Sequence, residues 1–414
     1  MHWNDEEVRA AFPALALTDA GVPRLYADAP GGTQVAGRVL ERMREALVDH
    51  NANEGGCFRT SVATDEGLLA AHAAAAEFVG GDPDEVVFGL NTTSLLFHFS
   101  RMIARDWKPG EEIVLSRMDH DANVGTWLVA AAERDVTVRW LDIDPATFRY
   151  RYDQLEHLIG PRTRLVACNH ASNLLGTIND VGRIVAAGRA VGAVTVVDGV
   201  QSAPHLPLDA HGLGCDLLTT SPYKYFGPHA GLLYVRRDFG ARLSPLKIRT
   251  SPDTMPHRHA PGTPSFEAQL GTVGAIEHIA WLGTRFGDAD ADAPLRARLT
   301  AGLAAATRHE ETLSRRFLAG LAAMPHITLH GIADPSALEE RVPTFSFSVD
   351  AHAADAVSQR FAARNMYVAS GSFYAMEPAR ALGVYESGIV RVGFSHYNTI
   401  GEVDAILAVL SSLE

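Results

Sequence analysis

The segment TTSPYKYFGPHAGLLYV, residues 219–235, places a single lysine, Lys224, in a turn between two apolar runs. Pro222 before the lysine and Pro228 after it restrict the backbone, Gly227 and Gly231 lie close by, and a tyrosine stands directly before and directly after the lysine. A solvated surface lysine needs no such setting. The segment therefore predicts a strand, a turn that holds one lysine in a fixed place, and a second strand.

Similar strand patterns recur between residues 85 and 237. Short runs of β-branched and apolar residues predict strands at residues 85–90, 111–116, 136–143, 163–170, 193–200, 216–221 and 231–237. Helical periodicity follows most of them, for example at residues 124–134 and 181–192. Strands that alternate with helices indicate an α/β fold with a mainly parallel seven-stranded sheet, covered by helices on both faces.

The last third of the chain has a different pattern. A helix predicted at residues 293–324 leads into the strand-like runs ITLHGI, PTFSFSVD and IVRVGFSH, and residues 400–413 predict a closing helix. This order is typical of a smaller C-terminal α+β domain. We therefore expect a large α/β domain at residues 20–265, and a small domain in which residues 1–19 join residues 266–414.

Composition and charge exclude several classes of protein. The chain has 414 residues, of which 47% are hydrophobic and 21% charged, as in ordinary globular proteins. Its net charge of −13 and the lack of a basic run argue against a nucleic-acid or membrane partner. The N-terminus, MHWNDEEV, is acidic where a signal peptide is basic, and no apolar run reaches the roughly 18 residues of a membrane span. We expect a cytoplasmic protein that acts on a small molecule.

Cysteines and histidines do not form a metal or disulfide pattern. Cys57, Cys168 and Cys215 are widely spaced, which is typical of free thiols and matches neither a disulfide framework nor a zinc site. The histidines likewise lack a ligand spacing. We therefore predict no metal.

Polar residues follow several of the predicted strands. They are the run Asn91-Thr92-Thr93-Ser94, Asn173, Asp198 with Gln201, and Ser221 with Lys224. In open α/β sheets, ligands bind beyond the carboxyl ends of the strands. The hydroxyls and free N–H groups of a helix start form an anion site there. An aspartate, a lysine 26 residues later, an anion site and amide side chains are the parts needed to hold pyridoxal phosphate.

The chemistry of that cofactor explains these residue types. A lysine bonds to the cofactor's aldehyde only when its amine is uncharged, which burial favours, and the released amine can then move the substrate's α-proton. An aspartate such as Asp198 keeps the pyridine nitrogen protonated, so that the ring withdraws electrons. The hydroxyl-lined helix start would bind the phosphate.

Ordered motifs along nearly the whole chain resemble those of a known family. They are RLYADAPGGTQV, NTTSLLFHF, MDHDANVGTW, ASNLLGTIND, VDGVQSAPHLPLD, SPYKYFGPHAG, APGTPSF and VRVGFSHYNT. This set resembles the class V aminotransferase family of fold-type I pyridoxal phosphate enzymes, and within it the cysteine desulfurase-like branch. The resemblance implies the fold-type I transferase fold and a homodimer with shared active sites.

The resemblance also implies roles for residues around the cofactor ring. Lys224 would bind the cofactor covalently, and Asp198 would pair with the pyridine nitrogen. His120 would stack on the face of the ring. Asn173 and Gln201 would lie near the phenolic oxygen, with Asn173 also facing the substrate.

Further implied roles concern the phosphate and the substrate. Thr92, Thr93 and Ser221 would bind the phosphate, and Thr263 would reach it from the neighbouring subunit. Arg391 would bind the substrate's α-carboxylate, since a guanidinium can donate two parallel hydrogen bonds to a carboxylate.

Several positions depart from the desulfurase pattern. Desulfurases carry a nucleophilic cysteine on the loop before the carboxylate-binding arginine, and Tyr374 stands at that position here, with no cysteine after Cys215. Tyr223 replaces the histidine that precedes the lysine in the family. Two basic positions are replaced by Gly56 and Ala369, which would enlarge and neutralise the substrate side of the pocket. A persulfide-forming desulfurase is therefore disfavoured.

These features lead to a functional prediction with alternatives. We expect a C–S β-lyase that acts on an S-substituted cysteine in small-molecule or natural-product biosynthesis, such as lincosamide-type pathways. Alternatives are an aminotransferase or epimerase of the same family, or decarboxylation coupled to oxidative deamination of such a conjugate. A non-catalytic scaffold is disfavoured by the retention of Lys224 and Asp198. Whether Tyr223 or Tyr374 donates a proton stays open.

Overall fold

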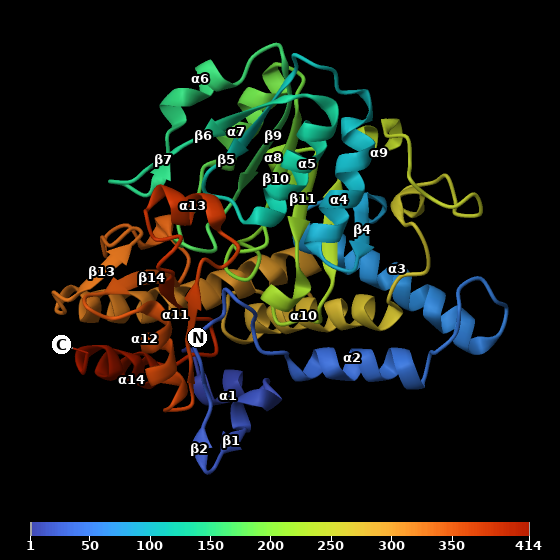
Figure 1. The fold of residues 1–414 in the computed structure, drawn as a ribbon. Helices are drawn as coiled ribbons and strands as arrows, with labels where there is room; N and C mark the ends of the chain where they lie inside the picture. Colours follow the sequence, from blue (N-terminus) through green and yellow to red (C-terminus); the bar gives the residue numbers. More distant parts are fainter. Residues whose placement is uncertain (1, 414) are drawn as a thin grey trace.

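A seven-stranded sheet forms the centre of the computed structural model, which describes residues 2–413 (Figure 1). Its strands, in spatial order, are β4 (Val86–Gly89), β12 (Gly231–Val235), β11 (Leu217–Thr220), β10 (Val194–Asp198), β9 (Thr163–Asn169), β5 (Glu112–Ser116) and β6 (Thr137–Leu141). Strand β12 is antiparallel to both of its neighbours, and the other pairs are parallel. The predicted α/β fold with a mainly parallel seven-stranded sheet is confirmed.

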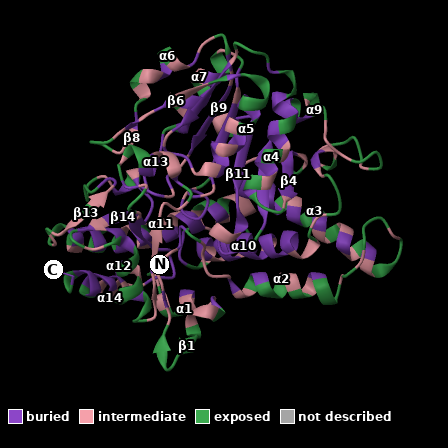
Figure 2. Cartoon of the chain, viewed as in Figure 1, coloured by how far each residue is buried: buried purple, intermediate pink, exposed green. Residues whose placement is uncertain are grey.

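Helices cover both faces of this sheet (Figure 1). Neighbouring strand residues point to opposite faces, so Val196 and Leu217 pack in one core and Val197 and Leu218 in the other. The first core contains α4 (Thr92–Ile103) and α5 (Gly125–Arg134); the second contains α3 (Arg59–Val79), α7 (Val181–Ala190) and α10 (Phe266–Arg285). Both faces of the central strands are buried, as Figure 2 shows, and most of their buried residues are apolar. The edge strand β6 is only partly buried.

A second, four-stranded antiparallel sheet lies in the C-terminal part. Its order is β13 (Ile327–His330), β14 (Thr344–Val349), β17 (Ile389–Gly393) and β16 (Ala369–Gly371). The helices α11 (Leu295–Ala322), α12 (Ala354–Ala362) and α14 (Ile400–Ser411) contribute to its core. The predicted C-terminal strands and helices are therefore present, and β17 carries Arg391.

Shorter elements complete the chain. They are the helices α1 (Asp5–Ala10), α2 (Gly37–Val48), α6 (Leu155–Leu158), α8 (Ala210–Leu213), α9 (Arg237–Arg242) and α13 (Met376–Ala381), and the paired strands β1 (Thr18–Asp19) with β2 (Val22–Pro23), β3 (Leu25–Tyr26) with β15 (Met366–Tyr367), and β7 (Ile143–Asp144) with β8 (Arg149–Tyr150).

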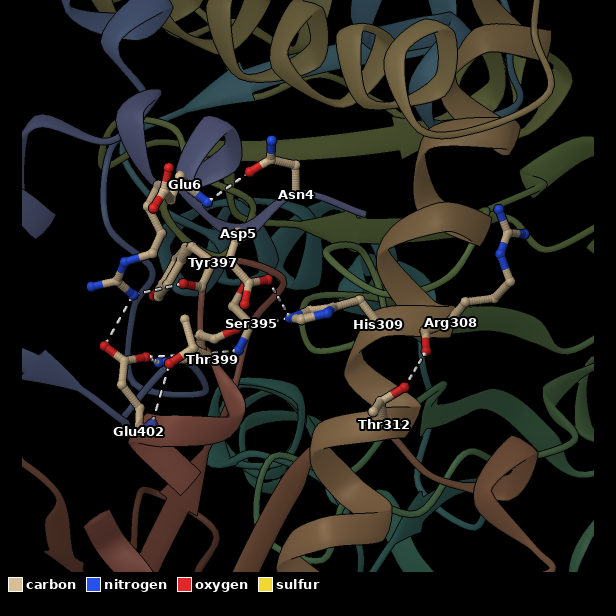
Figure 3. Close-up of polar contacts among 12 residues, drawn as sticks. Asn4, Asp5, Glu6, Arg308, His309, Thr312, Ser395, Tyr397, Thr399 and Glu402 are labelled. Carbon is tan, nitrogen blue, oxygen red and sulfur yellow. Dashed lines mark hydrogen bonds and ion pairs between the residues drawn. The ribbon is translucent and has the colours of Figure 1, made fainter. Parts of the chain in front are cut away.

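The N-terminal segment is attached to the C-terminal part. Arg9 of α1 donates from Nη1 to the backbone oxygen of Tyr397 at 2.8 Å and to Glu402 Oε1 at 3.0 Å. Glu402 also completes the capping box of α14 with Thr399, as Figure 3 shows. Val8 and Phe12 of the same segment pack in the core of the large sheet. Residues 1–19 therefore contact both parts, and grouping them with the C-terminal part stays a proposal.

The predicted domain boundary near residue 265 stays a proposal. Helix α10 packs in the core of the large sheet, together with Leu299 and Leu303 of α11. The core of the small sheet includes α11 from Leu313 onward and also Leu25. Helix α11 therefore contributes to both cores.

None of the helices in the described part of the chain combines the length and the apolar character that crossing a bilayer requires.

Candidate active site

A cavity of about 970 Å³ opens at the carboxyl edge of the large sheet, next to the C-terminal sheet. Most of the predicted site residues line it: Thr92, Thr93, His120, Asn173, Asp198, Gln201, Ser221, Tyr223, Lys224, Tyr374 and Arg391. Thr263 is exposed and is not part of the lining, so its predicted contribution to a neighbouring subunit stays a prediction. The volume of the cavity is in the range of ligand pockets.

The sheet topology explains how distant residues meet in this cavity. Segments that leave β4, β5, β9, β10 and β11 at their carboxyl ends supply Thr92, His120, Asn173, Asp198 and Lys224 in turn. The C-terminal sheet supplies the opposite wall, with Arg391 on β17 and Tyr374 in the turn after β16.

Lys224 ends a short 3-10 turn directly after β11. Its Nζ donates to the backbone oxygens of Pro30 and Gly31, the latter at 3.0 Å, and lies 4.7 Å from the centroid of the Tyr223 ring. Burial, with a smaller effect of the Arg391 charge, lowers the pKa of Lys224 to about 7. Near neutral pH, the amine is therefore uncharged for part of the time.

Asp198 ends β10, and its side chain is directed into the cavity. The residue is 5% exposed, and Oδ1 accepts a hydrogen bond from the backbone N–H of Val200 at 2.9 Å. Burial raises the pKa of Asp198 to about 6, against the effects of this hydrogen bond and of Lys224. At neutral pH the carboxylate is mostly ionised, and such a buried anion is stabilised by a protonated ring nitrogen.

His120 caps the short turn that follows β5. Its Nδ1 accepts a hydrogen bond from the backbone N–H of Ala122 at 3.0 Å, which leaves the proton of the neutral ring on Nε2. Burial lowers the pKa of His120 to about 4, so the ring is neutral. Its neighbour Asp119 is buried and accepts from Asn123 Nδ2 at 2.7 Å, which holds this turn in place.

The start of α4 has the groups that the predicted anion site requires. Thr92 and Thr93 are the first residues of this helix, and the Asn91 side chain caps it by accepting from the backbone N–H of Ser94 at 2.8 Å. The hydroxyls of Thr92 and Ser221 lie 2.7 Å apart. Hydroxyls and helix N–H groups at one place are suited to a phosphate.

Several buried polar atoms of the cavity residues lack a hydrogen-bond partner among the described residues. They are Asn173 Oδ1, Gln201 Oε1 and Arg391 Nε. Buried polar groups of this kind are normally satisfied, and a polar ligand in the cavity would satisfy them. Together with the buried amine, the buried carboxylate and the anion site, they fit pyridoxal phosphate.

Arg391 has contacts that the sequence analysis did not predict. It is 3% exposed, its Nη2 pairs with Asp28 Oδ1 at 2.7 Å, and its Nη1 donates to the backbone oxygen of Asn173 at 3.1 Å. Its Cζ lies 3.8 Å from the centroid of the Phe373 ring. Asp28 stands inside the motif RLYADAPGGTQV, and this position was the only signal that could have pointed to it.

The loop between β16 and α13 covers the cavity. Phe373 and Tyr374 both have positive φ values, 56° and 54°, which non-glycine residues rarely adopt. Two hydrogen bonds fix their carbonyl groups, from Asn173 Nδ2 to Phe373 O at 3.0 Å and from Asp121 N to Tyr374 O at 2.7 Å. The Tyr374 ring is 76% exposed and lies 5.6 Å from the His120 ring. The loop therefore carries an aromatic side chain at the mouth of the cavity.

Gly56 and Ala369, which replace two basic residues of the desulfurase pattern, lie in different parts of the structure. Ala369 lines the cavity, whereas Gly56 lies in the loop between α2 and α3 and is not part of the lining. Of these two replacements, only the one at Ala369 changes the lining of the cavity within a single chain.

A pH titration of the protein without cofactor tests the environment of Lys224. We expect the side-chain NMR signal of Lys224, in protein labelled at its lysines, to titrate with a midpoint near pH 7, because burial disfavours the charged amine. The amine is charged below this midpoint and neutral above it. The Lys224→Ala variant identifies the signal. A midpoint near pH 10 would show that the amine is solvated, contrary to the structure.

Comparisons with known proteins agree with this geometry. The family model described as Aminotransferase class-V matches residues 25–406. The chain is 32% identical to Aminotransferase-like protein FGM3 of Gibberella zeae, over 98% of this chain and 97% of that protein. It is 29% identical to a cysteine desulfurase of Pectobacterium carotovorum, over 100% and 98% of the two chains. The solved structure of a cysteine desulfurase from Thermococcus onnurineus NA1 matches with a TM-score of 0.87 and 25% identity, over 100% of this chain and 98% of that chain.

Proposed function

The chain belongs to the class-V aminotransferase family and is a pyridoxal phosphate-dependent enzyme, and we propose that it is a C–S β-lyase acting on an S-substituted cysteine. In this reaction the substrate loses its α-proton and the C–S bond breaks, with both bonding electrons leaving on sulfur. The thiolate takes up a proton, and water converts the remaining aminoacrylate to pyruvate and ammonia. No external oxidant or reductant is required.

The observation that carries this proposal is the residue composition of the cavity. None of the described residues that line it is a cysteine; Cys57 is exposed, and Cys168 and Cys215 are buried. Tyr374 stands where the resemblance expects the sulfur-accepting thiol of a desulfurase. Without an acceptor at the site, the departing sulfur has to leave as a free thiol, and an S-substituted cysteine provides this leaving group.

Each predicted residue has a part in this proposal. Bound pyridoxal phosphate would supply an electron-withdrawing ring that stabilises the negative charge left at Cα. Asp198 would hold the proton on the ring nitrogen, and His120 would cover the ring and exclude water. The amine of Lys224 would take the proton from Cα, since its lowered pKa leaves it partly neutral at pH 7. Arg391 would hold the substrate's carboxylate.

Further residues would hold the two ends of the cofactor. Thr92, Thr93 and Ser221 would bind its phosphate, and Asn173 and Gln201 would contact the phenolic oxygen through their buried amide groups. These contacts lie away from Cα, so they would fix the ring without blocking the reaction.

We also propose that the enzyme is a homodimer in which Thr263 reaches the partner's phosphate site. Figure 2 shows exposed stretches along α2 and α3. The exposed apolar residues there include Leu40, Leu47 and Leu69, which supports this proposal. Side chains of this kind are commonly covered by a second subunit.

Thiol release tests the proposed reaction. The cofactor-loaded protein is incubated with S-methylcysteine, S-phenylcysteine and free cysteine, and thiols and sulfide are measured with separate reagents. The proposal predicts that methanethiol and thiophenol are released catalytically. Sulfide and alanine from free cysteine, without thiol from either conjugate, would support a desulfurase instead.

The family alternatives predict other products. The name of the relative FGM3, an aminotransferase-like protein, favours transamination as the second candidate. An aminotransferase would form a new amino acid from an added keto acid and release no thiol. Carbon dioxide together with an aldehyde would indicate the decarboxylating reaction.

Replacing Tyr374 by phenylalanine tests whether this residue donates a proton to the leaving sulfur. We expect kcat for S-methylcysteine to fall about tenfold, which is below the usual effect of a general acid because the ring is largely exposed. An aryl thiolate is a weaker base and needs no proton, so kcat for S-phenylcysteine should stay within about twofold of wild type. Tyr223→Phe is the matched comparison. If kcat of the Tyr374→Phe variant equals that of wild type with both substrates, Tyr374 has a packing role only.

A further inference from the structure

One turn of the chain contacts both of the cations in the cavity. Asp28 pairs with Arg391, and two residues further on the backbone oxygens of Pro30 and Gly31 accept from the amine of Lys224. Hydrogen bonds from the N–H groups of Gly31 and Gly32 to the Asp28 carbonyl, at 2.9 and 3.2 Å, close this turn. We call residues 28–32 the acidic turn. It lies within the motif RLYADAPGGTQV.

The acidic turn has a fixed place in the fold. It is joined to β17, the strand that carries Arg391, by a hydrogen bond from the N–H of Ala29 to the oxygen of Gly393 at 3.3 Å. A side chain at Gly393 would clash with Pro30, and a side chain at Gly31 would clash with the carboxylate of Asp28. Gly393 is therefore needed for the close approach of Pro30, whereas a side chain at Gly31 would displace the Asp28 carboxylate.

The contacts of Arg391 leave part of its guanidinium unused. Asp28 occupies Nη2 and the Asn173 carbonyl occupies Nη1, while the buried Nε has no partner among the described residues. A buried arginine with one carboxylate is already neutralised. A second carboxylate therefore meets the repulsion of the first beside a buried guanidinium, although the Asp28 side chain itself is 30% exposed.

We propose that Asp28 holds the place of the substrate's carboxylate on Arg391, so that binding exchanges one carboxylate for the other and Asp28 excludes carboxylates that lack an amine. The inference rests on the proposed role of Arg391 in carboxylate binding. An amino acid also gains the bond between its amine and the cofactor, and this gain offsets the loss of the Asp28 pair. A simple carboxylate has only the contact with Arg391 and competes poorly. Asp28 is thus a specificity-determining residue that acts through Arg391.

Asp28 is also coupled to Lys224. Its negative charge raises the pKa of Lys224, against the larger lowering effects of burial and Arg391. Removing that charge should therefore move the titration midpoint of Lys224 to lower pH. If Asp28 had a purely structural role, its replacement would not be expected to lower the titration midpoint of Lys224 and at the same time tighten carboxylate binding.

The test measures binding of propionate, a carboxylate without an amine, to the cofactor-loaded protein by calorimetry. Asp28→Asn keeps an oxygen that can accept from Arg391 and removes the charge. We expect its Kd for propionate to be at least about tenfold lower than that of wild type. Asp19→Asn is the matched control, since Asp19 pairs with Arg24 in an exposed position, and its Kd should equal that of wild type. Adding Arg391→Gln to Asp28→Asn should abolish the gain.

An unchanged or weaker propionate affinity in Asp28→Asn would overturn the inference, as would a gain that survives the loss of Arg391. If Asp28→Asn does not fold, Gly31→Ala gives the second test, because its new methyl group displaces the Asp28 carboxylate and should also tighten propionate binding. Failure of this inference can be distinguished from failure of the proposed function. The inference concerns carboxylate affinity, and it can hold even if no S-conjugate releases a thiol.

Discussion

Replacing Lys224 by alanine is expected to lower kcat by about 10³- to 10⁴-fold and to abolish covalent attachment of the cofactor. The amine is the group in the cavity whose lowered pKa, about 7, lets it act as a base near neutral pH. Removing it takes away both the proton acceptor at Cα and the covalent anchor of the cofactor. The residues that we propose bind the phosphate, at the start of α4, are retained, so the cofactor should still bind, but reversibly.

Reduction with borohydride and mass spectrometry check this expectation. In the wild type, the cofactor's mass should appear on the peptide that contains Lys224, and in the variant it should be absent from every peptide. Lys108→Ala is the matched control, because Lys108 is exposed and lies outside the cavity. A Lys224→Ala variant that retains more than about a tenth of wild-type turnover would contradict the assigned role.

Replacing Asp198 by asparagine should lower kcat by about 10²- to 10³-fold, similar to the loss of a single preorganised electrostatic partner in other active sites. Asparagine has nearly the same shape, and its oxygen can still accept from the N–H of Val200. It lacks the negative charge that would keep the ring nitrogen protonated. The ring then withdraws electrons less strongly, and removal of the α-proton becomes slower.

Two measurements separate this electronic effect from loss of folding or of cofactor. The thermal unfolding midpoint and the absorbance of bound cofactor should stay near those of wild type, because the phosphate site does not involve Asp198. Supplying a cofactor analogue whose ring nitrogen carries a permanent positive charge should restore part of the rate. Full activity of Asp198→Asn with the natural cofactor would show that Asp198 does not act on the ring nitrogen.

The α/β fold could be predicted from the sequence because strands buried on both faces leave a direct signal. β9 and β10 are nearly continuous apolar runs, and both end in a polar residue, Asn169 and Asp198. Parallel order then places these ends at one edge of the sheet. The cavity is lined by most of the residues that this argument and the family resemblance had indicated.

The pairing of Asp28 with Arg391 could not be predicted in the same way. The two residues are 363 positions apart, and β3, which precedes Asp28, has only two residues and therefore no detectable periodicity. The backbone conformation of Phe373 and Tyr374 could not be predicted either. Their positive φ values are set by tertiary contacts and not by the local preference of aromatic residues. Hydrogen bonds from Asn173 and Asp121 impose that conformation.

The balance of products from S-methylcysteine tests the central claim most directly. The cofactor-loaded protein is sampled over time, and methanethiol, pyruvate and ammonia are measured in each sample. We predict that the three appear in equal amounts, over many turnovers, and that Lys224→Ala forms all three at least about 10³-fold more slowly. Formation of a new amino acid, or loss of substrate without thiol and pyruvate in equal amounts, would contradict it.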